Sequence, residues 1–350
     1  LLPALARARK AIRELPLADG ATVLVAFSGG QDSLALLAAA AFVAKHKSWQ
    51  LRAVTVDHQL RAHSDVDARD AIALANQLGV KGEIHTVQVP GGTQGRGHGG
   101  PEAAARTARY RALSRAAHHH HADAVLLGHT QDDQAEGVLL ALARGAGARS
   151  LAGMRAQVGI WYRPLLSLTR AETALICQTL HLQPVIDPSN ALSGPWRAAD
   201  GSALKRIALR ERVMPLLTDI LGPGVTAALA RTATQLRRDD DALRTLAIAA
   251  RNSALVYQDK AKVWLRRTGL QPLHAAVRTR VLHMCAQQLA TSQVLAVQVA
   301  DMDRLVMDNA VRGPVYCADA VTVCRDDGLI KFQGRNNNKG ERRGRSRYGQ

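Results

Sequence analysis

Residues 21–33, with the sequence ATVLVAFSGGQDS, decide the fold of the N-terminal part of this chain. The apolar run 21–27 predicts a buried strand, and the Ala/Leu-rich run 33–43 predicts a helix. A strand that turns through two glycines into a helix leaves backbone N–H groups and the positive helix dipole facing one point. We therefore expect a phosphate-binding loop at residues 28–33; the alternative is a simple helix cap.

Strands and helices continue to alternate after this loop. We expect further strands at 51–56, 83–89 and 124–127, and further helices at about 64–78 and 132–143. Alternation at this spacing is typical of a parallel sheet with right-handed crossover connections. The fold class predicted for residues 1–190 is therefore α/β, a doubly wound, Rossmann-like parallel sheet.

The second half of the chain has a different pattern. Residues 187–202 are rich in Pro, Gly, Ser and Asn, which indicates a domain boundary, and we assign 191–220 to a connector. Helical spacing of leucines predicts a mainly helical domain at 221–334, which ends in a short C-terminal β-hairpin with its turn at 326–328. Residues 335–350, rich in Asn, Gly and Arg, predict a basic disordered tail. The glycine-rich segment 90–100 predicts either a linker or a lid.

The net charge indicates a polyanionic partner. The chain carries +17 at pH 7, of which the last sixteen residues supply only +5. The remaining excess is spread over the folded part of the sequence, and a hydrophobic content of 47% excludes a chain disordered throughout. Nucleic acid is the partner class that this charge favours.

The sequence indicates a protein of the cytoplasm. Its longest apolar run, residues 34–44, is too short to cross a membrane, so we expect no membrane partner. The four cysteines form no C-x-x-C pair, which disfavours zinc ribbons, iron–sulfur ligands and thioredoxin-type chemistry. The first residues show no secretory signal pattern, and sparse cysteines fit a reducing compartment.

Several motifs in order carry a resemblance. The segment SGG-x-DS after a first strand is similar to the phosphate loop of the PP-loop ATP pyrophosphatases. The segments that follow narrow the match: VDHQLR at 56–61, EAAARTARYRAL at 102–113, GHTQDDQAE at 128–136, RPLL at 163–166 and DPSN at 187–190. In this order, over about residues 20–220, they resemble bacterial tRNA(Ile)-lysidine synthetases.

The resemblance implies a reaction and its components. An enzyme of this family uses ATP and Mg²⁺ to adenylate O2 of the wobble cytidine in tRNA(Ile) with a CAU anticodon. The amine of L-lysine then attacks C2, forming lysidine and releasing AMP. Pyrophosphate leaves in the first step.

The phosphate site and the catalytic groups are assigned to the ends of predicted strands. Ligands bind open α/β sheets at the carboxyl ends of strands, and Asp132, Asp133 and Glu136 open a helix there, where spacing puts Glu136 on the face of Asp132 or Asp133. Such carboxylates bind Mg²⁺ or hold and deprotonate the lysine amine; the alternative is a set of acids that complement a helix dipole. The ATP-binding candidates are Ser28, Gly29, Gly30, Gln31, Asp32, Ser33, His58 and Arg61; the catalytic candidates are Asp32, His129, Asp133 and Glu136; the metal candidates are Asp32 and Asp132.

Arginine-rich segments are the candidate tRNA contacts. Arg106 and Arg109 share a helix face near Tyr110, which suits phosphate binding and base stacking. The complete set of tRNA-binding candidates is Arg106, Arg109, Tyr110, Arg206, Arg210 and Arg212. We expect the helical domain to dock the body of the tRNA and the tail to act as an electrostatic tether.

Departures from the pattern leave alternatives open. Gly137 stands where the family has a Thr, and residues 190–206 are longer than usual. A thiolase-like PP-loop enzyme and a noncatalytic RNA-binding protein remain alternatives, of which the absence of C-x-x-C disfavours the first. A homodimer is compatible with the sequence.

Overall fold

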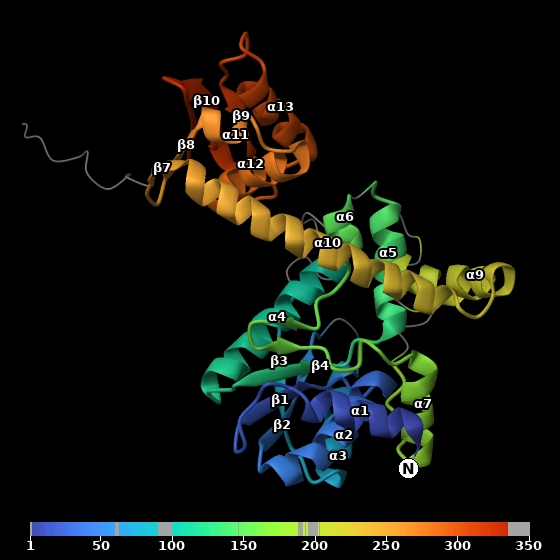
Figure 1. Cartoon of the computed structure of the whole chain (residues 1–350). Coiled ribbons are helices and arrows are strands. Elements are labelled where there is room, and N and C mark those ends of the chain that lie inside the picture. The colour runs from blue at the N-terminus through green and yellow to red at the C-terminus, as the bar shows by residue number, and fades with distance from the viewer. Residues whose placement is uncertain are drawn as a thin grey trace, which may run out of the picture. The chain divides into compact units, whose positions relative to one another are not determined.

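The computed structural model describes residues 2–59, 63–89, 100–145, 147–187, 192, 194, 202 and 204–334. The predictions for Arg61, for most of the glycine-rich segment 90–100, for residues 188–190 and for the tail 335–350 therefore lie outside the described residues. The chain forms two compact units, Leu1–Arg237 and Arg238–Gln350 (Figure 1). This division falls inside helix α10 (Val225–Ala254), downstream of the boundaries predicted at 190 and 220.

The first unit contains the predicted parallel sheet. Its six strands have the order β3-β2-β1-β4-β6-β5, and every neighbouring pair is parallel except β5 with β6. The strands are β1 (Thr22–Ala26), β2 (Gln50–Asp57), β3 (Lys81–Thr86), β4 (Ala124–Leu127), β5 (Gln157–Val158) and β6 (Trp161–Tyr162). The predicted α/β fold class is confirmed, and β4 has the predicted bounds.

Helices cover both faces of this sheet. The helices between residues 3 and 179 are α1 (Pro3–Arg13), α2 (Gln31–Lys47), α3 (Ser64–Gln77), α4 (Gly100–His119), α5 (Gln131–Leu142), α6 (Ala148–Leu151) and α7 (Arg170–Thr179). In β1, Val23 and Val25 pack against α1, α2 and α7, whereas Leu24 and Ala26 pack against α4. Figure 1 shows α4 on the face opposite α1 and α2. Burial on both faces explains why β1 is apolar throughout.

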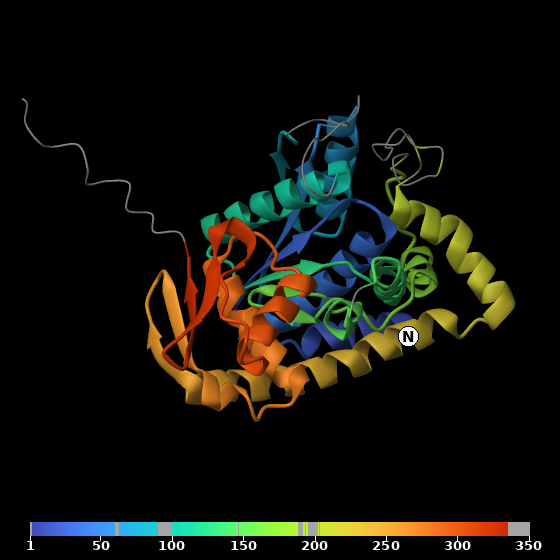
Figure 2. The same cartoon turned by 90° about the horizontal axis from the view of Figure 1, so that it is seen from above.

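A helical segment completes the first unit. It consists of α8 (Lys205–Ala208), a single π-helical turn at Leu209–Val213, α9 (Met214–Leu221) and the first half of α10. The helix α10 runs without interruption for 30 residues and is the long yellow-to-orange helix in Figure 2.

The second unit is mainly helical, as predicted, with a larger sheet than the expected hairpin. Strands β10 (Thr322–Asp326) and β11 (Leu329–Gln333) form the hairpin, and β7 (Leu255–Gln258), β8 (Lys262–Arg266) and β9 (Val315–Tyr316) extend it to the order β7-β8-β11-β10-β9. The helices α11 (Arg267–Leu270), α12 (Ala275–Leu289) and α13 (Ala296–Met307) pack with this sheet around Leu282, Ile330 and Phe332. The added strands show that this unit has a mixed core.

Within the described ranges, no single helix is both long enough and apolar enough to cross a bilayer. Only the bent pair Lys205–Leu221 and Val225–Ala254, with an angle of 99° between its parts, meets the length and composition test when the two are combined.

Candidate active site

The loop between β1 and α2 has the geometry of an anion-binding turn. Gly30 is the residue before α2, and no side chain caps the start of this helix. The first N–H groups of α2 and its positive dipole end therefore suit a phosphate. Ser33 Oγ donates to the Gly30 carbonyl at 2.8 Å and accepts from the Ser28 amide at 3.3 Å. The two serines thus fix the turn from inside.

Glycine is required at position 29. Its φ is +77°, and a Cβ there would lie 2.8 Å from Val185 Cγ2 and 3.0 Å from Ala71 Cβ. The Val185 amide also donates to the Gly29 carbonyl at 3.0 Å. The chain after α7 therefore packs directly on the loop, and a larger residue would displace one from the other.

Gly128 allows β4 to approach the start of α2. A Cβ at this position would lie 3.1 Å from the Ser33 amide nitrogen and 3.2 Å from the Asp32 carbonyl oxygen. The close approach brings the loop after β4, and with it α5, next to the phosphate loop. Sequence reasoning gave Gly128 no role of its own, although its place after a strand was a usable signal.

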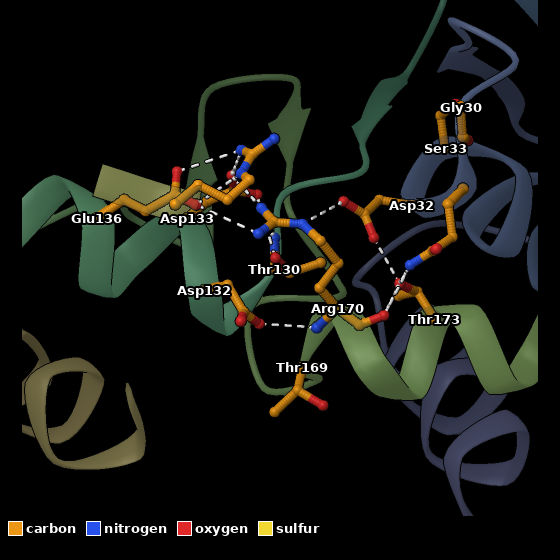
Figure 3. Close-up of polar contacts among 12 residues, drawn as sticks. Gly30, Asp32, Ser33, Thr130, Asp132, Asp133, Glu136, Thr169, Arg170 and Thr173 are labelled. Atoms are coloured by element: carbon orange, nitrogen blue, oxygen red, sulfur yellow. Dashed lines mark hydrogen bonds and ion pairs between the residues drawn. The ribbon is translucent and has the colours of Figure 1, made fainter. Parts of the chain in front are cut away.

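Asp32 lies on the first turn of α2 and faces α7. Its Oδ1 accepts a hydrogen bond of 2.5 Å from Thr173 Oγ1, and its Oδ2 lies 3.5 Å from Arg170 Nε (Figure 3). Burial raises the pKa of the Asp32 carboxyl above its ordinary value, while Thr173 and Arg170 act in the opposite direction. The Oδ2 atom has the looser contact of the two.

The predicted carboxylate helix is α5, and its acids face different partners. Asp133 Oδ2 accepts from the Thr130 amide at 2.8 Å, as expected for a residue that caps its own helix. Glu136 is 1% exposed and shares partners with Asp133, whereas Asp132 Oδ2 accepts from the Arg170 amide at 2.7 Å. Of the two pairings that the sequence allowed, Asp133 with Glu136 is therefore the one observed.

Arg170 joins the carboxylates of α5 to Asp32. Its Nη1 lies 3.2 Å from Glu136 Oε1 and its Nη2 lies 3.2 Å from Asp133 Oδ1 (Figure 3). Burial alone would raise the pKa of Asp133, but Arg170 and the Thr130 amide outweigh it, so that the pKa lies below its ordinary value. Asp133 is thus held as an anion, which suits the binding of a cation.

Two of the arginines predicted to bind tRNA contact the same carboxylates. Arg210 Nε lies 2.9 Å from Glu136 Oε1, and Arg210 Nη2 lies 3.5 Å from Asp133 Oδ1. Arg206 Nε forms a looser ion pair of 3.3 Å with Glu136 Oε2. Arg212, on the π-helical turn with Arg210, is exposed. The side chains of Arg206 and Arg210 therefore close one side of the carboxylate site.

Two histidines follow the ends of β2 and β4, as predicted. Burial is the main cause that lowers the pKa of His58, and the charge of Arg109 is the second. The same two causes lower the pKa of His129 to about 3. Both imidazoles are thus neutral at pH 7. Their Nδ1 atoms are buried without a hydrogen-bond partner among the described residues. Neutral rings with a free nitrogen suit hydrogen bonding to a ligand rather than charge pairing.

On α4, Arg106 is exposed and the neighbouring Tyr110 is half-buried. Arg106 Cζ is 5.1 Å from the centre of the Tyr110 ring, which in turn lies 5.1 Å from the Trp161 ring. The Tyr110 hydroxyl accepts from Arg163 Nη2 at 3.4 Å. An open hollow of about 580 Å³ on this helix is lined by Arg106, Thr107, Tyr110, Arg111, Ser114 and Arg115.

The residues around the phosphate loop fit a Mg²⁺ ion that is coordinated partly by phosphate oxygens, and not one that is coordinated by protein side chains alone. Among the described residues, no group of three or more His, Cys, Asp and Glu side chains is arranged to hold a metal. Within the described part of the chain, however, Asp32 Oδ2 has one polar contact, of 3.5 Å with Arg170, and it belongs to the phosphate loop. One carboxylate oxygen together with phosphate oxygens is the usual donor set for Mg²⁺ at such sites.

Sequence reasoning missed Arg170 and Thr173. Both lie on α7, more than 30 residues from the carboxylates that they contact. The spacing Thr169-x-x-Glu172 is a capping-box signal that could have located the start of α7, where Arg170 is the first residue. No local pattern could have identified the partners of Arg170.

The phosphate loop, the parallel sheet and the adjoining carboxylates together define a nucleotide-binding enzyme domain of the PP-loop class. A family described as PP-loop domain matches residues 4–217. The structure is also similar to the U34-tRNA thiolase NcsA from Methanococcus maripaludis, with a TM-score of 0.55 and 19% identity, covering 67% of this chain and 78% of that one. At this identity the likeness shows the fold alone.

Curated relatives give the closer classification. The tRNA(Ile)-lysidine synthase of Thermobifida fusca (strain YX) is 42% identical over 324 residues, covering 92% of this chain and 94% of that protein. The tRNA(Ile)-lysidine synthase of Leifsonia xyli subsp. xyli (strain CTCB07) is 41% identical over 325 residues, covering 91% and 92%. The chain belongs to the tRNA(Ile)-lysidine synthase family.

Proposed function

We propose that this protein is an ATP-dependent ligase that forms lysidine at the wobble cytidine of tRNA(Ile) with a CAU anticodon. The cytidine O2 attacks the α-phosphorus of ATP, and the bond to the leaving pyrophosphate breaks. The amine of L-lysine then attacks C2, loses a proton, and expels AMP with the former O2. The family relationship, which extends over more than nine-tenths of the chain, is the observation that carries this proposal.

ATP is assigned to the edge of the sheet where β1, β2 and β4 end. The amides at the start of α2 would face a phosphate there, with Ser28, Gly29, Gly30, Gln31 and Ser33 as the loop around it. Asp32 Oδ2 would hold Mg²⁺, which neutralises phosphate charge as pyrophosphate leaves. His58 and His129, both neutral and with an unpartnered Nδ1, would hydrogen-bond to the nucleotide or to the cytidine. Arg61 is part of the same proposal from its sequence position.

L-lysine is assigned to the carboxylates of α5. Asp133 and Glu136 lie within ion-pair distance of arginines, in a site that also adjoins Asp32. A lysine amine next to these oxygens is oriented toward the activated cytidine and can lose its proton to a carboxylate. The neighbouring Arg206 and Arg210 would pair with the lysine carboxylate.

The tRNA is assigned to the arginines of α4 and to the second unit. Arg106 and Tyr110 line the hollow on α4, which has no acidic residue in its lining, whereas Arg109 is half-buried and its charge lowers the pKa of His58 and of His129. Phosphate groups would bind these arginines, and the Tyr110 ring offers a face for a base. Arg212 is exposed and remains a candidate tRNA contact.

Two other functions receive less support. A thiolase with a catalytic cysteine would need a reactive thiol in the first unit, where Cys177 is the only cysteine in the sequence. Burial is the main cause that raises the pKa of the Cys177 thiol to about 11, and the charge of Asp32 is the second. The thiol is therefore not a thiolate at pH 7. A noncatalytic RNA-binding protein would not need three carboxylates facing a polyanion. The cytoplasmic location and the homodimer stay predictions.

The experiment is incorporation of radiolabelled lysine into an unmodified tRNA(Ile) transcript with a CAU anticodon. We expect label only when ATP and Mg²⁺ are both present, and none in a methionine tRNA with the same anticodon. Release of AMP without label would keep the PP-loop chemistry and exclude lysidine. If neither labelled tRNA nor AMP is formed, the protein has a nucleotide-binding fold without this catalytic activity.

Asp32→Ala is the variant that tests the phosphate-loop assignment. We expect it to abolish AMP release, because the variant loses the carboxylate of the phosphate loop itself. Circular dichroism and tRNA binding should remain those of the wild type. Full activity in this variant would contradict the assignment.

A further inference from the structure

Arg170 contacts both halves of the proposed site through its backbone. Its amide donates to Asp132 Oδ2 at 2.7 Å, and its carbonyl accepts from Gln31 Nε2 at 2.7 Å. Gln31 is the first residue of α2 and Asp132 lies on the first turn of α5. The first residue of α7 therefore ties the phosphate loop to the carboxylate helix.

The guanidinium of Arg170 divides its donors between the same two elements. Nη1 and Nη2 each lie 3.2 Å from a carboxylate of α5, Glu136 and Asp133, while Nε lies 3.5 Å from Asp32 Oδ2. The contacts with α5 are thus closer than the contact with Asp32. A planar fork with donors in three directions can make this set of contacts, whereas the single nitrogen of a lysine cannot.

A substrate ammonium would compete with this guanidinium. Asp133 and Glu136 are the carboxylates assigned to L-lysine above, and Arg170 occupies one oxygen of each. An ammonium that binds these oxygens weakens their attraction for Arg170. The charge of Arg170 is then free to act on a phosphate group beside Asp32, since Nε already faces that side.

We propose that Arg170 is a positioning residue that couples the two substrate sites. Binding of the L-lysine ammonium to Asp133 and Glu136 releases the guanidinium toward the phosphates of ATP. Each substrate therefore tightens the binding of the other, because the coupling between two sites is reciprocal. This inference rests on the proposed function, since it takes lysine and ATP as the two ligands.

The direct test is the dissociation constant of L-lysine with and without bound nucleotide. The titration uses the whole protein, saturating tRNA(Ile) transcript, Mg²⁺ and an ATP analogue with a methylene bridge between the α- and β-phosphorus atoms. We expect the analogue to tighten lysine binding by about fivefold or more, within the usual range of such couplings. Equal dissociation constants with and without the analogue would overturn the proposal.

Arg170→Lys is the informative variant, because it keeps the charge and loses the fork. We expect lysine and the analogue to bind this variant independently, with a ratio of dissociation constants near one. Arg170→Gln serves in its place if the first variant does not fold. A variant that folds and keeps the wild-type ratio would show that the coupling, if present, does not pass through Arg170.

Arg7→Ala is the matched control. Arg7 pairs with Glu172 Oε1 at 2.5 Å and donates to the Ser167 carbonyl, so it supports the same segment of chain from the outside. This variant should keep the wild-type coupling. If coupling is lost here too, the effect of the Arg170 variants comes from a general disturbance of α7 and not from the guanidinium of Arg170. A wild-type protein that attaches lysine to tRNA but shows no coupling overturns this inference alone, whereas one that binds no lysine overturns the proposed function.

Discussion

The hydroxyl of Thr173 donates a hydrogen bond of 2.5 Å to Asp32 Oδ1, and this contact joins α7 to the phosphate loop. Thr173 is fully buried, and its hydroxyl also lies 2.8 Å from the Arg170 carbonyl. Asp32 thus presents its other oxygen, Oδ2, to the site. A residue 141 positions away in the sequence therefore orients the carboxylate that we assign to Mg²⁺.

Replacement of Thr173 by Val should move the acidic limb of the pH–activity profile to higher pH. Burial raises the pKa of Asp32, and the Thr173 hydrogen bond opposes this rise, so its loss raises the pKa further. Because the proposed binding of Mg²⁺ requires the ionised carboxylate, we expect activity to require a higher pH in this variant. The measurement is kcat/KM for AMP release between about pH 5 and 9.

Thr173→Ser is the control for this variant, because it keeps the hydroxyl and removes only a methyl group. Its acidic limb should coincide with that of the wild type. A valine variant whose limb also coincides would show that the hydrogen bond has no influence on Asp32.

Gly128→Ala should weaken ATP binding and lower stability. The new methyl group would meet the Ser33 amide and the Asp32 carbonyl, which are backbone atoms that cannot rotate away. We expect a loss of about 1–3 kcal/mol in the free energy of unfolding, as for other overpacked sites, and a higher KM for ATP. Thermal unfolding and AMP-release kinetics measure the two effects.

Gly137→Ala, in α5, should have the opposite effect on stability from Gly128→Ala. A Cβ at Gly137 meets nothing within 4 Å, and the residue lies inside α5. Alanine there should stabilise the protein by up to about 1 kcal/mol, because it favours the helix. Equal effects of the two alanines would contradict the close approach described for Gly128.

Much of the first unit could be predicted because its signals are local. The run 21–33 contains the strand, the glycine turn and the start of the helix within thirteen residues, and all three were found there. The strand at 124–127 was likewise predicted with its observed bounds, because a short buried apolar run leaves little choice.

The contacts of the site could not be predicted, because they join distant segments. Arg206 and Arg210 lie in an arginine-rich segment that indicates RNA binding, yet both approach Glu136, 70 or more residues away.

Strands β7 and β8 were missed for a related reason. The sequence at 255–266 mixes apolar and charged residues, and β8 becomes a strand by pairing with β11.

Glu136→Gln should raise the KM for L-lysine and reduce stability. The side chain is almost fully buried and pairs with Arg170, Arg206 and Arg210, so the variant leaves three guanidinium groups without their shared charge. We expect the KM to rise about tenfold or more, which corresponds to ~1.4 kcal/mol of lost binding. The loss of stability should be about 1–2 kcal/mol, less than for a fully buried ion pair, because the arginines retain some solvent.

Asp65→Asn is the control for loss of a carboxylate. Asp65 pairs with Arg69 at 2.6 Å on the exposed surface of α3. Such a pair contributes about 0.5 kcal/mol or less, so both lysine KM and stability should remain close to the wild-type values. A Glu136→Gln variant with an unchanged lysine KM would remove Glu136 from the lysine site.

His129→Gln should reduce the loss of stability on acidification. Burial and the neighbouring Arg109 lower the pKa of His129 to about 3 in the folded protein, against 6.5 for the free side chain. The unfolded chain therefore binds a proton that the folded chain does not between these values, and stability falls as the pH drops below 6.5, by about 1 kcal/mol per pH unit. Urea unfolding at about pH 7 and pH 5 should show a smaller difference for His129→Gln than for the wild type. His118→Gln, at an exposed position of α4, should keep the wild-type difference, and an unchanged difference in His129→Gln would mean that His129 titrates alike in both states.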